Sequence, residues 1–146
     1  MPRAGRLSYA RDMIQLPQRV LDAAWLPLRI GAGLLMATHG WPKVQNIEGF
    51  AGAVEGMGFP APLFFAWVAA LAELVGGLLV AAGALTRSAS LSVALTMAAA
   101  AFLRHGGDPL ARKEKALLYL LIFAAFALAG GGPYSVDRLW ARRKRG

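Results

Sequence analysis

Two charged residues stand inside otherwise apolar stretches of this 146-residue chain. Arg29 begins the run RIGAGLLMATHGWPKV, and Glu73 lies in the middle of AALAELVGGLLVAAG. A charge inside an apolar helix is costly unless it meets an opposite charge or a polar cavity. If the first helix ends at His39, Arg29 lies about 15 Å from that end, at a rise of 1.5 Å per residue. By the same rise, Glu73 lies about 16 Å from Pro62, where the second run begins. Because these depths agree, we expect a buried ion pair between Arg29 and Glu73.

This expected pair has two interpretations. In the first, it only fixes the register of two neighbouring helices, which is a frequent role of buried polar pairs. In the second, Glu73 accepts a proton inside a polar cavity. Both interpretations stay open at the level of the sequence.

The two histidines, His39 and His105, are each followed by glycine, a pattern typical of the C-terminus of a helix. If their helices run in the same direction, both imidazoles lie at one end of the molecule. Other polar residues expected at this end are Lys43, Asp108, Glu114 and Tyr119.

Three roles fit such a cluster. A histidine at a helix C-terminus complements the helix dipole and is then structural. Two histidines would also serve as axial ligands of a haem, and the whole cluster would bind and protonate a quinone headgroup. The sequence holds no HxxxH or HExxH pattern, P-loop or Rossmann fingerprint, so we expect no metal ligands. On the quinone interpretation, the catalytic residues are Glu73, His39, His105 and Glu114, and the substrate-binding residues are Arg29, Lys43 and Tyr119.

The composition indicates a membrane protein. Hydrophobic residues make up 57% of the chain and charged residues only 16%, whereas soluble domains average roughly 25% charged residues. Four apolar segments, 23–41, 62–85, 88–103 and 116–132, approach the length of about 20 residues that crosses a bilayer. The last two contain no charge, although a soluble bundle would carry charges on its outer faces. We therefore predict an all-α fold, an integral membrane bundle of four transmembrane helices. The segments at 42–61 and 104–115 are expected to be loops, and Thr86-Arg87 a tight turn.

The net charge of +8 is concentrated at the two ends of the chain. These ends flank apolar segments, so contact with anionic lipid explains them better than binding to nucleic acid. With both termini in the cytoplasm, ten Lys and Arg residues lie inside and five outside, which favours this orientation. No signal peptide is apparent, and the absence of cysteine excludes a thiol relay on this chain.

The chain divides into three expected parts. Residues 1–22 form a basic cytoplasmic segment, with a short interfacial helix over 13–21. Residues 23–137 form the transmembrane domain, and 138–146 form a basic tail. Ser135 or Asp137 is expected to cap a short helix that leads into this tail.

The joint pattern of these motifs resembles the DoxX family of small four-helix bacterial membrane proteins. The resemblance spans about 29–137 and is carried by RIGAGLLMATHGWPKV, by GFPAPLFFAWVAALAELVGGLLVAAGALTRSAS, by the segment from Glu114 to Tyr119, and by GPYSVD. It implies an integral inner-membrane protein linked to redox chemistry. DoxD relatives are associated with thiosulfate:quinone oxidoreductase, and other relatives with membrane oxidoreductase complexes in thiol-stress defence.

The expected function is a quinone-linked oxidoreductase subunit of the bacterial inner membrane, with quinone as cofactor and the lipid bilayer as surroundings. In this hypothesis Lys43 attracts an anionic substrate such as a sulfur oxyanion. A first alternative is a non-catalytic scaffold or assembly subunit that holds a redox partner protein or a larger membrane complex. A second is a small transporter, since buried charge pairs line substrate paths. A homo-oligomer is compatible with each of them, and no nucleic-acid partner is expected.

Overall fold

The computed structural model describes residues 18–144, and every regular element in that range is a helix. In chain order these are α2 (Gln18–Gln45), α3 (Ile47–Glu55), α4 (Pro62–Ala82), α5 (Thr86–Ala99), the π-helix η1 (Ala100–Arg104), α6 (Leu110–Ala129) and α7 (Val136–Arg143). The all-helical prediction is confirmed for these residues. Most of the interfacial helix expected over 13–21 lies outside them, and its last residues, from Gln18 onward, belong to α2.

Within residues 18–144, three helical stretches are long and apolar enough to cross a membrane: Val20–Gln45, Pro62–Ala82 and Thr86–Arg104. The fourth expected segment, 116–132, corresponds to α6, but this helix begins earlier, at Leu110. Its N-terminal turns carry four consecutive charged residues from Arg112 to Lys115. The uncharged remainder, 116–129, would extend about 21 Å at 1.5 Å per residue, short of a hydrocarbon core of about 30 Å.

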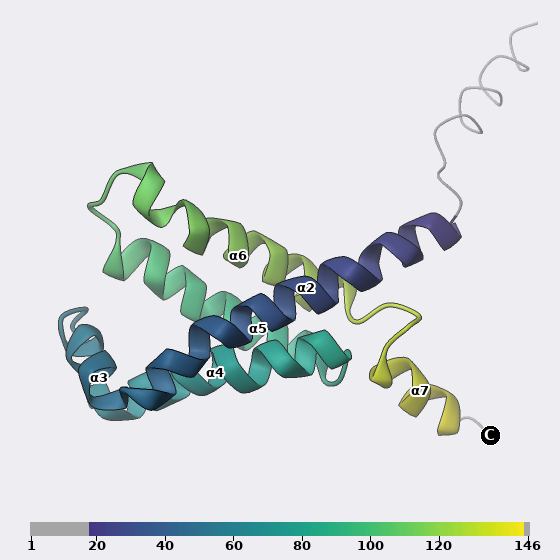
Figure 1. Cartoon of the computed structure of the whole chain (residues 1–146), viewed down its shortest axis with the longest axis horizontal. Helices are drawn as coiled ribbons and strands as arrows, with labels where there is room; N and C mark the ends of the chain where they lie inside the picture. The colour runs from purple at the N-terminus through teal and green to yellow at the C-terminus, as the bar shows by residue number, and fades with distance from the viewer. Residues whose placement is uncertain (1–17, 145–146) are drawn as a thin grey trace, which may run out of the picture.

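The helices form two antiparallel pairs that diverge at one end of the molecule. Figure 1 shows α2 lying along α4, with α3 beside the far end of this pair, and α5 running beside α6. Toward the left of that view, α6 lies well away from α3. We call this the α3 end; it includes η1 and the N-terminal turns of α4 and α6. The opposite end, which holds the start of α2 and all of α7, is the terminal end.

Small residues bring α2 and α4 into close contact. A Cβ built on Gly33 would lie 2.5 Å from the backbone oxygen of Gly77 and 2.6 Å from the backbone nitrogen of Ala81. At Gly40, a Cβ would overlap the backbone of Leu74. Small residues allow this approach in membranes, where tight backbone packing drives helix association. Gly33 and Gly40 of α2 therefore pack directly against the backbone of α4.

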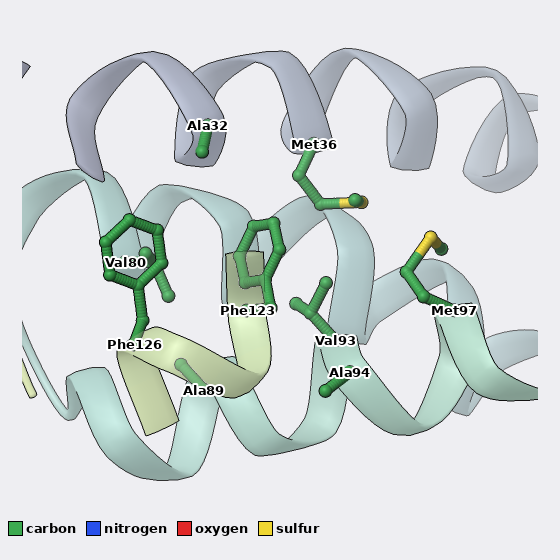
Figure 2. Packing of buried hydrophobic residues seen from close by; sticks show 9 residues of the cluster. All are labelled: Ala32, Met36, Val80, Ala89, Val93, Ala94, Met97, Phe123 and Phe126. Carbon is green, nitrogen blue, oxygen red and sulfur yellow. The ribbon is translucent and has the colours of Figure 1, made fainter. Parts of the chain in front are cut away.

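The bundle interior is filled mainly by small and flexible side chains. Figure 2 shows Phe123 and Phe126 of α6 facing Ala32 and Met36 of α2. The other members of this buried cluster are Val80 of α4 and Ala89, Val93, Ala94 and Met97 of α5. Many larger apolar residues, including Leu34, Leu71, Leu78 and Leu91, are exposed. Exposed apolar surface on this scale suits a lipid solvent.

Asp137 joins the turn between α4 and α5 to the beginning of α7. One carboxylate oxygen accepts a hydrogen bond from the backbone of Leu85 at 2.7 Å, and the other accepts bonds from the backbone and hydroxyl of Thr86 at 2.9 and 2.7 Å. The backbone N–H of Asp137 in turn donates to Gly83. Asp137 thereby satisfies the free N–H groups at the start of α5. Of the two caps predicted for the last helix, Ser135 or Asp137, the structure has Ser135.

Arg29 belongs to this same terminal assembly. Its guanidinium donates to the backbone carbonyls of Gly131 and Tyr134, and one turn earlier the Trp25 indole donates to Gly130 at 3.1 Å. The predicted ion pair between Arg29 and Glu73 is therefore wrong. Because α2 continues past His39 to Gln45, its register against α4 is shifted, and Glu73 lies beside Gly40. Gly40 is eleven residues from Arg29, about 16 Å along the helix.

Several expected boundaries also differ from the structure. Residues 42–61 were expected to be a loop, but α2 runs on through Pro42 and α3 follows, capped by the side chain of Asn46. Gly40 is consequently a packing residue and not the cap of a helix that ends at His39. The α4–α5 turn lies at Gly83 to Leu85, where both of these residues have positive φ, and Thr86 already begins α5.

The close contact of α2 with α4 generates a first prediction. Gly33→Ala should lower the midpoint of thermal unfolding in detergent, because the added methyl group meets the backbone of α4; overpacking of this kind costs about 1–3 kcal/mol. Gly31→Ala is the matched control, since a Cβ there meets nothing within 4 Å. Its effect should be neutral or stabilising, because alanine is the better helix former. Equal destabilisation by both substitutions would contradict this packing.

A second prediction concerns Asp137. Asp137→Ala should destabilise the fold by about 2 kcal/mol, because it leaves helix N-terminal donors without their acceptor. Asp22→Ala is the control, since the hydrogen bond of Asp22 is to the exposed Gln18; a change below about 0.5 kcal/mol is expected there. Thermal unfolding followed by circular dichroism compares the two. An Asp137→Ala variant as stable as the control would refute this role for the carboxylate.

Candidate functional site

A buried ion pair joins α2 and α4 near the α3 end. The Nζ of Lys43 donates to Oε1 of Glu73; the Glu73 side chain is 2% exposed and that of Lys43 29%. The second carboxylate oxygen, Oε2, is buried and has no hydrogen-bond partner among the described residues. An unsatisfied buried oxygen of this kind is costly and calls for a functional explanation.

The positions of both partners follow from the helices that carry them. Lys43 reaches Glu73 only because α2 continues beyond Trp41 and because Gly40 lets the backbone of α4 come close. On its other side, Nζ of Lys43 lies 4.8 Å from the centre of the Phe50 ring of α3. This cation–π contact, together with the carboxylate, fixes the ammonium group. The helix α3, expected to be a loop, therefore supports the site.

Two cavities meet at this ion pair. The larger, of about 510 Å³, lies among α3, α4, α5 and η1; we call it the apolar cavity, since its walls include Val54, Met57, Phe65, Val68 and Leu95. The smaller, of about 320 Å³, lies among α2, η1 and α6; we call it the polar cavity. It is lined by His39, Arg112, Lys115 and Tyr119, among others. Lys43, Glu73, Ala100 and His105 line both cavities. The ion pair therefore lies at the boundary between an apolar and a polar compartment.

Aromatic and charged contacts hold the walls of the polar cavity. The rings of His39 and Tyr119 meet edge to face, with centroids 5.6 Å apart, a favourable geometry for aromatic pairs. Nδ1 of His105 lies 2.8 Å from the Asp108 carboxylate, and Arg112 lies 3.6 Å from the other oxygen of Asp108. The hydrogen bond from His105 holds the pKa of Asp108 below its ordinary value. These contacts tie the η1–α6 loop to the rim of the cavity.

Five of the seven predicted site residues lie around these cavities: Glu73, Lys43, His39, His105 and Tyr119. Glu114 is exposed and lines neither cavity, and Arg29 lies at the terminal end. No group of three potential metal-ligating side chains occurs in the described part of the chain. Assignment of chemical roles to the five clustered residues remains a prediction.

Sequence reasoning missed Arg112 and Lys115 as members of the cluster. Both were expected in a loop, whereas they lie in the first turns of α6. Their spacing could have indicated a shared helix face with Tyr119, because positions 112, 115, 116 and 119 follow the i, i+3, i+4, i+7 pattern. Extending the fourth helix toward its N-terminus would have placed them beside Tyr119.

The sequence profile of the DoxX family matches residues 24–106. The Inner membrane protein YqjF of Escherichia coli K12 is 32% identical over 128 residues, which cover 84% of this chain and 95% of that protein. A Bacillus subtilis protein named "Putative oxidoreductase CatD" is 39% identical over 72 residues, which cover 49% of this chain and 52% of the relative. An uncharacterized protein of Haemophilus influenzae is 31% identical, over 80% of this chain and 90% of the relative. No solved structure matches significantly. With its helical bundle, its membrane-length helices and this breadth of similarity, the chain is a membrane protein that belongs to the DoxX family.

Proposed function

We propose that this protein is a quinone-binding subunit of a membrane redox system, with the Lys43–Glu73 pair as its headgroup site. One observation carries the proposal: Glu73 presents a buried carboxylate oxygen without a hydrogen-bond partner among the described residues, at the wall of a largely apolar cavity. A bound molecule that combines a polar head with an apolar body satisfies both features. A quinone in its reduced form is such a molecule, since a quinol hydroxyl donates a hydrogen bond to a carboxylate oxygen, and the oxidised form accepts one from a protonated carboxyl group.

The apolar cavity has suitable size and surroundings for this ligand. Small-molecule sites are mostly apolar clefts of roughly 300–1,000 Å³ with a few placed polar groups, and the volume of about 510 Å³ falls within that range. Val68 and Leu95 of its lining are 48% and 64% exposed. In a bilayer these side chains face lipid, so the cavity is accessible to a ligand dissolved in the membrane.

Lys43 and Glu73 would have different roles at the quinone headgroup. The ammonium of Lys43, which contacts the Glu73 carboxylate, donates a hydrogen bond to one ring oxygen. Protonated Glu73 then donates to the same oxygen as negative charge develops there. Complete reduction of a quinone consumes two electrons and two protons, and in this proposal a partner redox protein supplies the electrons. CatD, whose name describes an oxidoreductase, lends support to a redox role.

We also propose that α6 is a fourth transmembrane helix and that both termini are cytoplasmic. Arg112 and Lys115 line the polar cavity, so the charges that shorten the apolar part of α6 have an aqueous environment available. The ten-to-five distribution of basic residues supports this orientation. The name of YqjF supports the inner membrane as the location.

The scaffold alternative rests on α7. This helix carries Arg138, Arg142 and Arg143, and its Leu139 and Trp140 are exposed. A basic helix with exposed apolar groups suits a partner protein of a larger redox complex, or a second copy of this chain. Removal of residues 140–146 should then release the co-purifying partner, and a partner retained by the shortened chain would argue against docking on α7.

The proposal predicts a specific effect of Glu73→Gln. This variant keeps the shape of the side chain but loses the charge and the exchangeable proton. Affinity for a short-chain quinone, titrated in its reduced form against the detergent-purified protein, should fall by about tenfold or more, since the hydrogen bond from its hydroxyl to a charged group contributes about 1.5–3 kcal/mol.

Glu55→Gln is the matched control, because Glu55 is exposed and lines neither cavity. Its quinone affinity should equal that of the unmodified protein. Size-exclusion profiles must show that both variants are folded. Equal affinities for the folded Glu73→Gln and Glu55→Gln variants would rule out Glu73 as the headgroup site.

A further inference from the structure

Glu73 lies at the meeting point of two compartments with opposite chemistry. On the side of α3 and α5 it faces the apolar cavity, whose exposed residues Val68 and Leu95 look toward lipid. On the side of α2 and α6 it faces the polar cavity. Binding of an apolar ligand alone does not explain the polar cavity.

We propose that the polar cavity is a water-filled proton route that connects Glu73 with the aqueous phase at the α3 end, separate from the route by which an apolar ligand enters. This inference rests on the proposed role of Glu73 as a proton donor. It adds that the proton reaches Glu73 from the aqueous phase at the α3 end.

The residues that line the polar cavity indicate that it contains water. The titratable and charged groups that line it are His39, Lys43, Glu73, His105, Arg112, Lys115 and Tyr119. Basic groups outnumber the single carboxylate, and such charges within a membrane bundle are stable only where they are paired or hydrated. The volume of about 320 Å³ holds several waters, since each takes about 30 Å³ in the liquid and needs two to four polar partners.

The mouth of this cavity opens at the start of α6. The Arg112 side chain is 72% exposed, and its nearest acidic partner, Asp108, lies in the loop between η1 and α6. Lys43, at the inner wall, is still partly exposed, whereas Glu73 behind it is not. The exposure therefore falls from Arg112 through Lys43 to Glu73, as expected for a path that leads inward from the α3 end.

The π-helix η1 shapes the boundary between the two cavities. Ala100, its first residue, lines both of them. His105, which directly follows η1, also borders both. Such π-turns often occur at functional sites. Here the turn lies at the boundary where Glu73 borders both cavities.

Carbodiimides of different solubility test the proposal without a quinone, because they react with a protonated carboxyl group to form a stable acylurea. In lipid nanodiscs, a water-soluble carbodiimide should reach Glu73 through the polar cavity, and dicyclohexylcarbodiimide should reach it from the lipid side. Mass spectrometry measures both acylurea adducts of Glu73, together with its amide cross-link to Lys43, because the neighbouring amine can capture the activated carboxyl group. Exposed Glu55 serves as a positive control for the water-soluble reagent.

Each route can be blocked after folding, since the chain has no cysteine of its own. Ala116→Cys places a thiol in the polar cavity, and Ala69→Cys places one in the apolar cavity. Each purified variant is then labelled with benzyl methanethiosulfonate, and its unlabelled form is the matched control. The benzyl group at position 116 should lower the water-soluble adduct of Glu73 by tenfold or more and leave the dicyclohexyl adduct unchanged. At position 69 the effects should be reversed.

Two results would overturn the proposal. In the first, the water-soluble reagent modifies Glu55 but not Glu73 in the unblocked protein. In the second, the benzyl group at position 116 leaves that reaction at Glu73 unchanged. Neither depends on quinone binding, so a failed quinone titration and a failed proton route are distinguishable.

Discussion

The close approach of α2 and α4 is the constraint on which the rest of the structure depends. Gly33 against Gly77 and Gly40 against Leu74 fix the register of the two longest helices. That register brings Lys43 to Glu73 and leaves Arg29 at the opposite end of the bundle. Because hydrophobic burial does not drive helices together in lipid, steric fit between small residues decides which polar groups meet.

The two ends of the molecule use their polar residues differently. At the terminal end, Arg29 and Asp137 bind backbone groups of the turn and of the chain after α6, so their charges satisfy carbonyl and N–H groups that a membrane would leave without partners. At the α3 end, Glu73 keeps one oxygen without a partner among the described residues and borders two cavities. Most polar groups at the terminal end thus have partners, although Nε of Arg29 has none among the described residues. The α3 end retains a carboxylate at the boundary of two cavities.

Much of this arrangement could be predicted from the sequence, because apolar runs and glycine-rich faces report the helices and their contacts directly. Glu73, Lys43, His39, His105 and Tyr119 were predicted to be site residues, and the structure brings them together. The partner of Glu73 could not be predicted, because it depends on the offset between two helices. Since α2 continues through Pro42, Gly40 and not Arg29 lies beside Glu73, a difference of about three turns. Arg112 and Lys115 were not predicted to belong to the site, because the charged residues before the fourth apolar segment were interpreted as a loop.

The most direct test of the account is the identity of what the protein carries in its own membrane. Protein purified in mild detergent from bacterial membranes is extracted with organic solvent, and quinones are identified by chromatography with absorbance detection. Quinone should be present in stoichiometric amount with the unmodified protein and should be absent from the folded Glu73→Gln variant. An extract without quinone from folded, unmodified protein would contradict the headgroup site and favour a scaffold role.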